Sequence, residues 1–168
     1  ISRASRILRL LDKLKSLSDS EITKLAKVLQ WYVRSLGATN RTENELMALA
    51  IEACRRTMGI IHFTVQVLAA IHLLNGRIIE MQTGEGKTAT AVLPTAVRSK
   101  RGLRCHVVTS NDYLAKRDAE VLQPAFGLLG LTVGCIQPEM SDVDRQMAYR
   151  CDITYSTAVQ LGFDYLRD

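Results

Sequence analysis

The stretch Met81-Gln82-Thr83-Gly84-Glu85-Gly86-Lys87-Thr88 decides how the rest of this chain is interpreted. It stands between a run typical of a short strand, residues 77–81, and a run typical of a helix, residues 87–100. Its last three residues match the end of the phosphate-binding loop pattern, which is glycine, four residues, then Gly-Lys-Ser/Thr. Met81 replaces the opening glycine of that pattern. The stretch therefore predicts a loop that binds the phosphates of a nucleotide.

The residue types in this loop suit phosphate binding for separate reasons. Gly84 and Gly86 let the backbone curl so that successive amides point at phosphate oxygens, and the following helix N-terminus adds partial positive charge. Lys87 would reach the β- and γ-phosphates, and Thr88 would hold Mg²⁺ through its hydroxyl. The alternative is a glycine turn with an incidental exposed lysine. The candidate nucleotide-binding residues of the loop are Thr83, Gly84, Glu85, Gly86, Lys87 and Thr88.

Strand and helix patterns alternate on the carboxyl side of the loop. The further strand candidates are residues 103–109, 131–136 and 152–156, and the helix candidates are residues 111–126, 141–149 and a segment after Thr157. Such alternation predicts an α/β fold with a parallel sheet. Ligands of these sheets bind beyond the carboxyl ends of the strands. We therefore expect the chemistry at residues 82–88, 110–113 and 156–160.

The residues before the loop predict helices only. Helical periodicity covers residues 7–17, residues 22–36, a third helix that ends near Gly59, and residues 65–74. Capping patterns at 18–21 and 42–45 predict the starts of the second and third helices. The apolar stripe expected to pack the second helix is Ile22, Leu25, Leu29, Trp31, Tyr32 and Leu36. We divide the chain into a helical segment, 1–75, and the first part of a nucleotide-binding domain, 76–168.

Composition excludes several classes of protein. The chain has 168 residues, of which 47% are hydrophobic and 23% charged, as is ordinary for a globular protein. The net charge is +5, and residues 1–34 carry all of this excess. A basic N-terminal arm on a neutral body argues against a surface made mainly for nucleic acid and leaves open contact with an acidic surface. The first residue is Ile1, so we expect the chain to be a piece of a longer protein.

The apolar run 60–74 is interrupted by polar residues and is shorter than the roughly 20 residues that span a bilayer. The four cysteines include no CxxC pair and no histidine spaced to complete a zinc site. Their apolar neighbours favour buried, reduced thiols and a cytosolic location. The sequence therefore predicts neither zinc nor disulfides.

Four further stretches, together with residues 80–88, resemble the SecA family of preprotein translocation ATPases in order and spacing. The loop of that family also has Met in the opening position. The stretches are Leu17–Glu21, Gly59–Gln66, Val107–Glu120 and Gly162–Asp168. The resemblance covers nearly the whole chain. Within it, Gln66 matches the family's adenine-recognising glutamine, and its amide can pair with adenine's N6 and N7.

The resemblance implies the first part of a RecA-like nucleotide-binding domain, as in superfamily 2 helicases. It also implies binding of ATP or ADP with Mg²⁺, and a chain that ends before the family's Walker B acid and catalytic glutamate. No catalytic residue is therefore expected within residues 1–168, and this piece alone should hydrolyse ATP poorly. In the whole protein, ATP would drive preproteins through a membrane channel.

The resemblance further implies a cytoplasmic protein peripheral to the inner membrane, with preprotein, a translocation channel and anionic lipid as partners. The amphipathic helix 7–17 either docks on the body or contacts an anionic membrane. Lys116 and Arg117 belong either to a solvated helix face or to a contact with a strand backbone. Nucleic acid is not expected as a partner.

The segment Tyr155–Leu161 departs from the family's usual Tyr-Gly-Thr-Asn-Asn-Glu-Phe, and Ser110 replaces a usual valine. These departures suggest a divergent SecA-like paralogue. Two other interpretations stay open, namely a piece of a nucleic-acid helicase and a non-hydrolysing interaction module with a vestigial loop.

Overall fold

The structure is a computed structural model that describes residues 2–167. Ile1, from which we expected a longer parent protein, and Asp168, which ends the string Gly162–Asp168, lie outside the described residues. The elements in chain order are α1 (Arg3–Leu14), α2 (Asp19–Ser35), α3 (Asn40–Met58), α4 (Thr64–Leu74), α5 (Lys87–Lys100), β1 (Cys105–Thr109), α6 (Asp112–Leu128), β2 (Val133–Cys135), α7 (Asp142–Arg150), β3 (Ile153–Thr157) and α8 (Ala158–Arg167). The predicted α/β class is confirmed.

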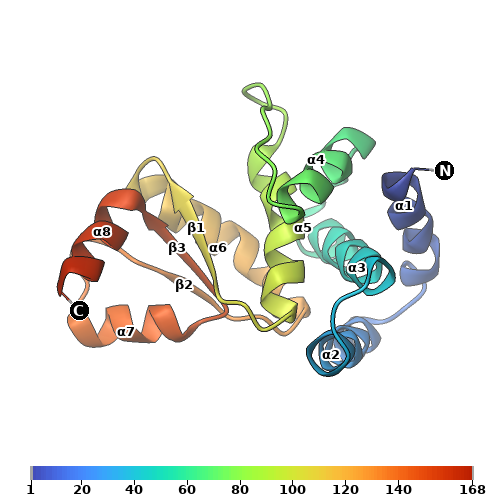
Figure 1. Ribbon diagram of the computed structural model, residues 1–168, viewed down its shortest axis with the longest axis horizontal. Coiled ribbons are helices and arrows are strands. Elements are labelled where there is room, and N and C mark those ends of the chain that lie inside the picture. Colours follow the sequence, from blue (N-terminus) through green and yellow to red (C-terminus); the bar gives the residue numbers. More distant parts are fainter. Residues whose placement is uncertain (1, 168) are drawn as a thin grey trace.

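Helices α1 to α4 gather at one end of the molecule, the sheet lies at the other end, and α5 runs between them (Figure 1). The sheet has three parallel strands in the order β1-β3-β2. Helix α6 packs against all three strands. On β2, a Cβ added to Gly134 would lie 2.6 Å from the carbonyl oxygen of Ala148, so glycine is required for the close approach of α7.

The predicted strand at residues 77–81 is wrong. Within the described chain this segment pairs with no strand, and Ile78 is 100% exposed. Figure 1 shows it as part of the loop that projects between α4 and α5. An apolar run becomes a strand only where a neighbouring strand supplies hydrogen bonds, and the sheet of residues 2–167 offers this segment no neighbour.

The capping prediction was right for α2 and misplaced for α3. The Ser18 hydroxyl accepts from the Glu21 amide at 3.3 Å, and the Glu21 carboxylate accepts from the Ser18 amide at 2.7 Å. Helix α3 starts one turn earlier than expected, because Thr39 is extended and its hydroxyl accepts from the Thr42 amide. Gly59 ends α3 with a positive φ of 68°, as predicted.

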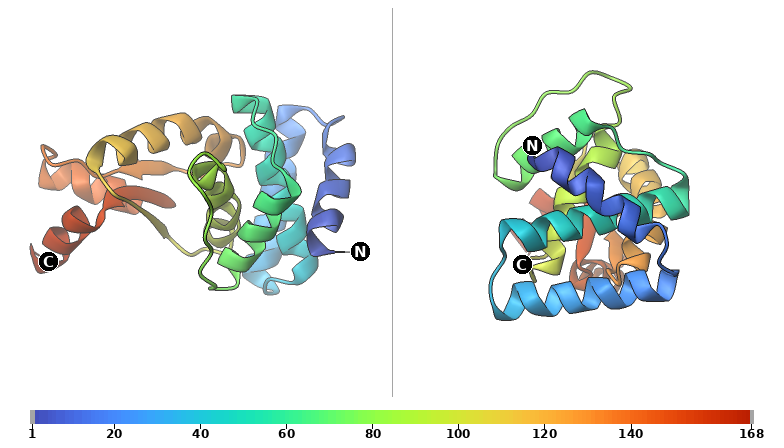
Figure 2. Two further views of the ribbon diagram at one scale, coloured as in Figure 1. Left: turned by 90° about the horizontal axis from the view of Figure 1, so that it is seen from above. Right: turned by 90° about the vertical axis from the view of Figure 1, so that its right-hand side faces the viewer.

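The side of α2 that packs differs from the predicted stripe. The buried residues are Ile22, Ala26, Leu29 and Val33. Trp31 is 60% exposed, and Tyr32 and Leu36 are exposed as well. Burial follows the face that meets α3, α5 and α6, and Trp31 and Tyr32 lie off that face. Figure 2 shows α2 along the outer edge of the molecule.

The buried apolar residues of the helical segment and of the α/β segment form one connected cluster. It includes Ile7 and Leu49 on one side of residue 75 and Leu93 and Phe126 on the other. The domain boundary at residue 75 therefore stays a prediction. No helix among residues 2–167 combines the length and the apolar character needed to cross a membrane.

Candidate nucleotide-binding site

The loop at residues 82–86 turns sharply into α5. Gly84 and Gly86 have φ values of +88° and +80°, a backbone region that favours glycine. Gly86 is the N-cap residue, and no side chain of the described chain caps this end of α5. The first amides of the helix are therefore available to an anion, and they lie where the helix dipole is positive.

Lys87 folds back over the loop. Its ammonium donates to the carbonyl oxygens of Met81 at 2.7 Å and Gln82 at 2.9 Å. The Glu85 carboxylate accepts from the Gln82 amide at 2.7 Å. These contacts keep the loop closed on itself by hydrogen bonds that an exposed lysine can exchange readily for phosphate oxygens.

Gln66 lies against the same loop. Its side-chain nitrogen donates to the Glu85 carbonyl at 2.8 Å, and its side-chain oxygen accepts from the Phe63 amide at 2.9 Å. A Cβ added to Gly86 would come within 2.5 Å of this nitrogen, so the contact is a second reason for glycine at position 86. An amide has two donor hydrogens and two acceptor lone pairs, so Gln66 retains capacity for a base.

Thr88 faces a carboxylate that sequence reasoning missed. Its hydroxyl donates to Asp118 Oδ2 at 3.4 Å, across the contact between α5 and α6. Asp118 Oδ1 accepts from Arg117 Nε and Nη2, at 2.9 and 2.6 Å. Arg117 is thus bound within its own helix. No local pattern predicts that Asp118 faces Thr88, because only packing of α6 beside α5 brings the two residues together.

His62 is buried beneath the first turn of α5. Its Nε2 lies 3.0 Å from the carbonyl oxygen of Ala89, and its Nδ1 is buried without a partner among the described residues. Burial lowers the pKa of His62, while the hydrogen bond to Ala89 opposes this shift. The lowered pKa favours the neutral imidazole beside the first turn of α5.

The other two expected loops meet each other at the carboxyl edge of the sheet. The Thr157 hydroxyl donates to Asp112 Oδ1 at 3.2 Å, and so joins the end of β3 to the start of α6. Gln160, at the start of α8, accepts from Arg145 at 2.9 Å. The hydrogen bonds of these residues connect them with each other and with α7, whereas those of residues 82–88 connect the loop with α4 and α6.

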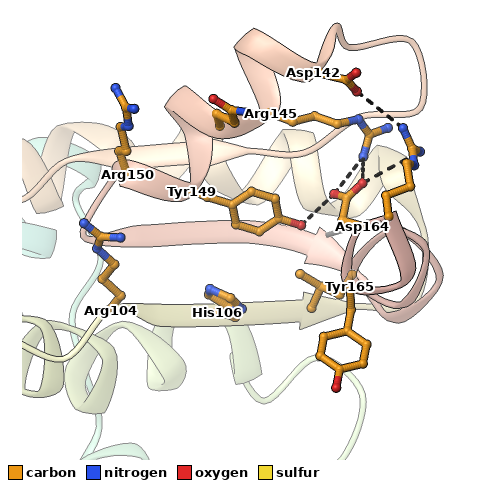
Figure 3. A pocket seen from close by; sticks show the side chains of 11 residues that line it. Arg104, His106, Asp142, Arg145, Tyr149, Arg150, Asp164 and Tyr165 are labelled. Carbon is orange, nitrogen blue, oxygen red and sulfur yellow. Dashed lines mark hydrogen bonds and ion pairs between the residues drawn. The ribbon is translucent and has the colours of Figure 1, made fainter.

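A cavity of about 890 Å³ lies on the far side of the sheet from α6 and is separate from the loop. Arg145, Tyr149 and Asp164 converge at one end of it, and Arg104 and His106 lie along β1 (Figure 3). Arg145 donates to both Asp164 oxygens, and the Tyr149 hydroxyl donates to Oδ2 at 2.7 Å. Asp164, which belongs to the string Gly162–Asp168, therefore anchors α8 to α7.

Two further predictions concern metals and cysteines. No group of three or more His, Cys, Asp or Glu side chains within the described chain is placed to share a metal ion. All four cysteines are free; Cys54 is buried and the other three are half-buried. Burial raises the pKa of Cys54 to about 12.

Residues 2–168 match the SecA DEAD-like domain family. The chain belongs to this family. The protein translocase subunit SecA of Emiliania huxleyi is 46% identical over 159 residues, which cover 92% of this chain and 18% of that protein. The subunit of the same name from Thermosynechococcus vestitus is 43% identical over 157 residues, or 94% of this chain and 17% of that protein.

A protein translocase subunit SecA 2 from Rhodopseudomonas palustris is 42% identical over 165 residues, or 98% of this chain and 20% of that protein. The chain thus spans about a fifth of the length of these relatives. The resemblance to SecA is confirmed, and membership of a DEAD-like domain family agrees with nucleotide binding. The individual binding residues stay predictions.

Proposed function

We propose that this chain is the ATP-binding part of a SecA-type motor that moves preproteins across a membrane. The observation that carries the proposal is the turned loop at Gly84–Gly86, which leads into the uncapped N-terminus of α5 with Lys87 at its start. Within a SecA family member, this geometry suits the phosphates of ATP or ADP better than any other ligand.

Each candidate residue has a distinct part in this proposal. The amides that follow Gly84 and Gly86 would face the phosphates, and Lys87 would exchange its two carbonyl partners for the β- and γ-phosphates. Gln66 would contact adenine with its remaining hydrogen-bonding capacity. Thr83 and Glu85 would shape the loop, and Thr88 would hold Mg²⁺, which neutralises phosphate charge when bound.

The experiment is calorimetry with ADP and Mg²⁺ on the 168-residue chain and on Lys87→Ala. We expect the variant to bind about tenfold to a hundredfold more weakly, because charge-assisted hydrogen bonds are worth roughly 1.5–3 kcal/mol. Lys116→Ala removes an exposed lysine from α6 and is the matched control. Equal affinity of wild type and Lys87→Ala would contradict the phosphate-loop assignment, and no binding at all would favour a vestigial loop in an interaction module.

We propose that preprotein transport requires a longer chain of which these residues are a part. Its partners would be preprotein and a membrane channel, at the cytoplasmic face of the inner membrane. The competing function is that of a nucleic-acid helicase, which shares a phosphate loop. The two differ in what stimulates ATP hydrolysis by the longer protein. Stimulation by unfolded preprotein but not by RNA is expected, and the reverse would favour the helicase.

We further propose that α2, instead of α1, carries the contact with anionic lipid. The apolar residues Ala4, Ile7 and Leu14 of α1 are buried in the core. Helix α2 instead exposes Val28, Trp31, Tyr32 and Leu36 beside the exposed cations Lys24, Lys27 and Arg34. Aromatic rings with a basic flank suit the interface of an anionic bilayer.

Trp31 is the only tryptophan of the chain, so its fluorescence reports on α2 alone. We expect a blue shift with vesicles of anionic phospholipid and none with vesicles of phosphatidylcholine. Lys24→Glu with Lys27→Glu should abolish the shift, whereas Arg9→Glu with Lys13→Glu, on α1, should reduce it far less. A shift lost equally in both double variants would mean that the contact depends on the general charge of residues 1–34 and not on α2. A shift that needs no lipid but grows with protein concentration would indicate that a second copy of the chain binds this face.

A further inference from the structure

Asp118 is a buried carboxylate at the mouth of the phosphate loop. Its side chain is 12% exposed, and it lies two turns into α6. Arg117 holds one oxygen, Oδ1, through two hydrogen bonds, at 2.9 and 2.6 Å. The other oxygen, Oδ2, accepts only the 3.4 Å hydrogen bond from the Thr88 hydroxyl among the described residues. A buried carboxylate oxygen with one long hydrogen bond has unused acceptor capacity.

Charge makes this arrangement unusual. The uncapped N-terminus of α5 and Lys87 suit an anion, yet Oδ2 of Asp118 presents negative charge one side chain away, at Thr88. Phosphates bound at the loop and the Asp118 carboxylate would repel each other across this short gap, since the medium between them is only partly water. A cation between the two anions converts that repulsion into attraction on both sides.

We propose that Asp118 positions the magnesium-binding hydroxyl of Thr88 and supplies negative charge that favours the cation; this rests on the proposed nucleotide function. By accepting a hydrogen bond from the Thr88 hydroxyl, Asp118 leaves the lone pairs of the Thr88 oxygen to the cation. Arg117 limits the charge of the carboxylate and keeps Oδ2 turned toward Thr88. Residues Thr88, Arg117 and Asp118 therefore act as one unit, with Asp118 as the positioning residue.

The decisive readout is the dependence of ADP affinity on Mg²⁺, measured by calorimetry with Mg²⁺ and with EDTA. In Asp118→Asn we expect the gain in affinity that Mg²⁺ gives wild type to fall about tenfold, the size of one charge-assisted hydrogen bond. With EDTA the same variant should bind ADP as tightly as wild type or more tightly, because a repulsive charge is gone. A merely structural role would weaken both affinities alike.

Glu120→Gln, which removes an exposed acid from the same helix, is the matched control and should leave both affinities unchanged. Thr88→Ser should keep the magnesium gain, and Thr88→Val should lose it. In the Thr88→Val background, Asp118→Asn should reduce the magnesium gain almost no further, because the two residues act together.

Arg117→Leu gives a second test that does not require Asp118→Asn to fold. It removes both the charge that offsets Asp118 and the two hydrogen bonds that orient it, so the magnesium gain should change. An unchanged gain in Asp118→Asn, or, where that variant does not fold, an unchanged gain in Arg117→Leu, would overturn the inference. Wild type that binds no ADP in either medium would instead overturn the proposed function itself.

Discussion

At the residue scale, Gln66 shows what tertiary contacts add to a sequence resemblance. The resemblance assigned Gln66 to adenine, and the structure places its amide on the Glu85 carbonyl of the phosphate loop. The spacing along the chain could not predict this contact, because α4 and the loop are brought together only by packing of α4 on α5. Gln66 therefore couples the candidate base site to the candidate phosphate site.

We expect Gln66→Ala to reduce the preference for ADP over GDP, because the amide edge distinguishes the N6 amino group of adenine from the O6 of guanine. Loss of the Glu85 contact should also weaken the binding of ADP and of GDP to the same extent. Competition of ADP and GDP for a fluorescent ADP analogue measures both effects, with Gln123→Ala on the exposed side of α6 as the control. An unchanged ADP/GDP ratio would restrict Gln66 to supporting the loop.

His62 predicts a pH dependence of stability. Burial lowers the pKa of the folded-state imidazole below its ordinary value, so the unfolded chain takes up a proton first as the pH falls. The free energy of unfolding should therefore decrease as the pH drops below about 6.5, the unperturbed histidine value. Urea titrations from pH 7.5 to 5.5 test this. His62→Gln should flatten the decrease, while His106→Gln, at an exposed histidine, should not.

At the element scale, local pattern was enough to predict the helices and the strands that pair. It was not enough to show that the run 77–81 has no neighbouring strand and forms none. Periodicity and caps are local, so α5, α7 and the strands β1 and β3 lie close to their expected ranges. The run 77–81 has the same apolar character, but its state depends on a neighbour that periodicity does not reveal. The exposed side of α2 is a similar case. Trp31 lies at the surface because α3 packs on the other face of α2, and the sequence of α2 alone does not show which face packs.

Lys100, at the end of α5, tests how α2 and α5 are joined. It is buried, and its ammonium donates to Gln30 on α2 at 2.9 Å. Burial lowers the pKa of Lys100 to about 8, below the roughly 10.4 of an unfolded chain. The cost of this buried charge is therefore present at pH 7 and disappears as the pH rises from 8 to 10.

We expect Lys100→Met to be at least as stable as wild type at pH 7, because a hydrophobic side chain of similar volume avoids the desolvation cost of a charge. The advantage should shrink steadily between pH 8 and pH 10. Guanidinium denaturation at each pH measures it, and Lys24→Met, at an exposed lysine of α2, should show no such trend. A Lys100→Met variant that is less stable at pH 7 would mean that the Gln30 hydrogen bond outweighs the burial.

At the scale of the whole molecule, the candidate site draws on α4, α5 and α6, and the core that holds these helices together runs across residue 75. The candidate phosphate loop could be predicted from the sequence because its residues are contiguous and each type has a local reason. The place of Asp118 at Thr88 could not be predicted, because the two residues lie 30 positions apart and no local pattern joins them. The candidate binding groups thus come from both halves of the chain.

Binding groups alone do not make an ATPase, and we expect the 168-residue chain to show no appreciable turnover of ATP even when it binds the nucleotide. Lys87 and Thr88 can neutralise and position phosphates, but neither activates the attacking water. A general base typically contributes about 10²–10⁴-fold, and an arginine finger roughly 10³–10⁵-fold. The Glu85 carboxylate is held by the Gln82 amide, and Asp112 is held by Thr157 at the sheet edge.

Phosphate release by purified protein measures turnover, with Lys87→Ala to exclude a contaminating enzyme. Steady turnover that Lys87→Ala abolishes would show that a base acts within these residues, and Glu85→Gln and Asp112→Asn would then identify it.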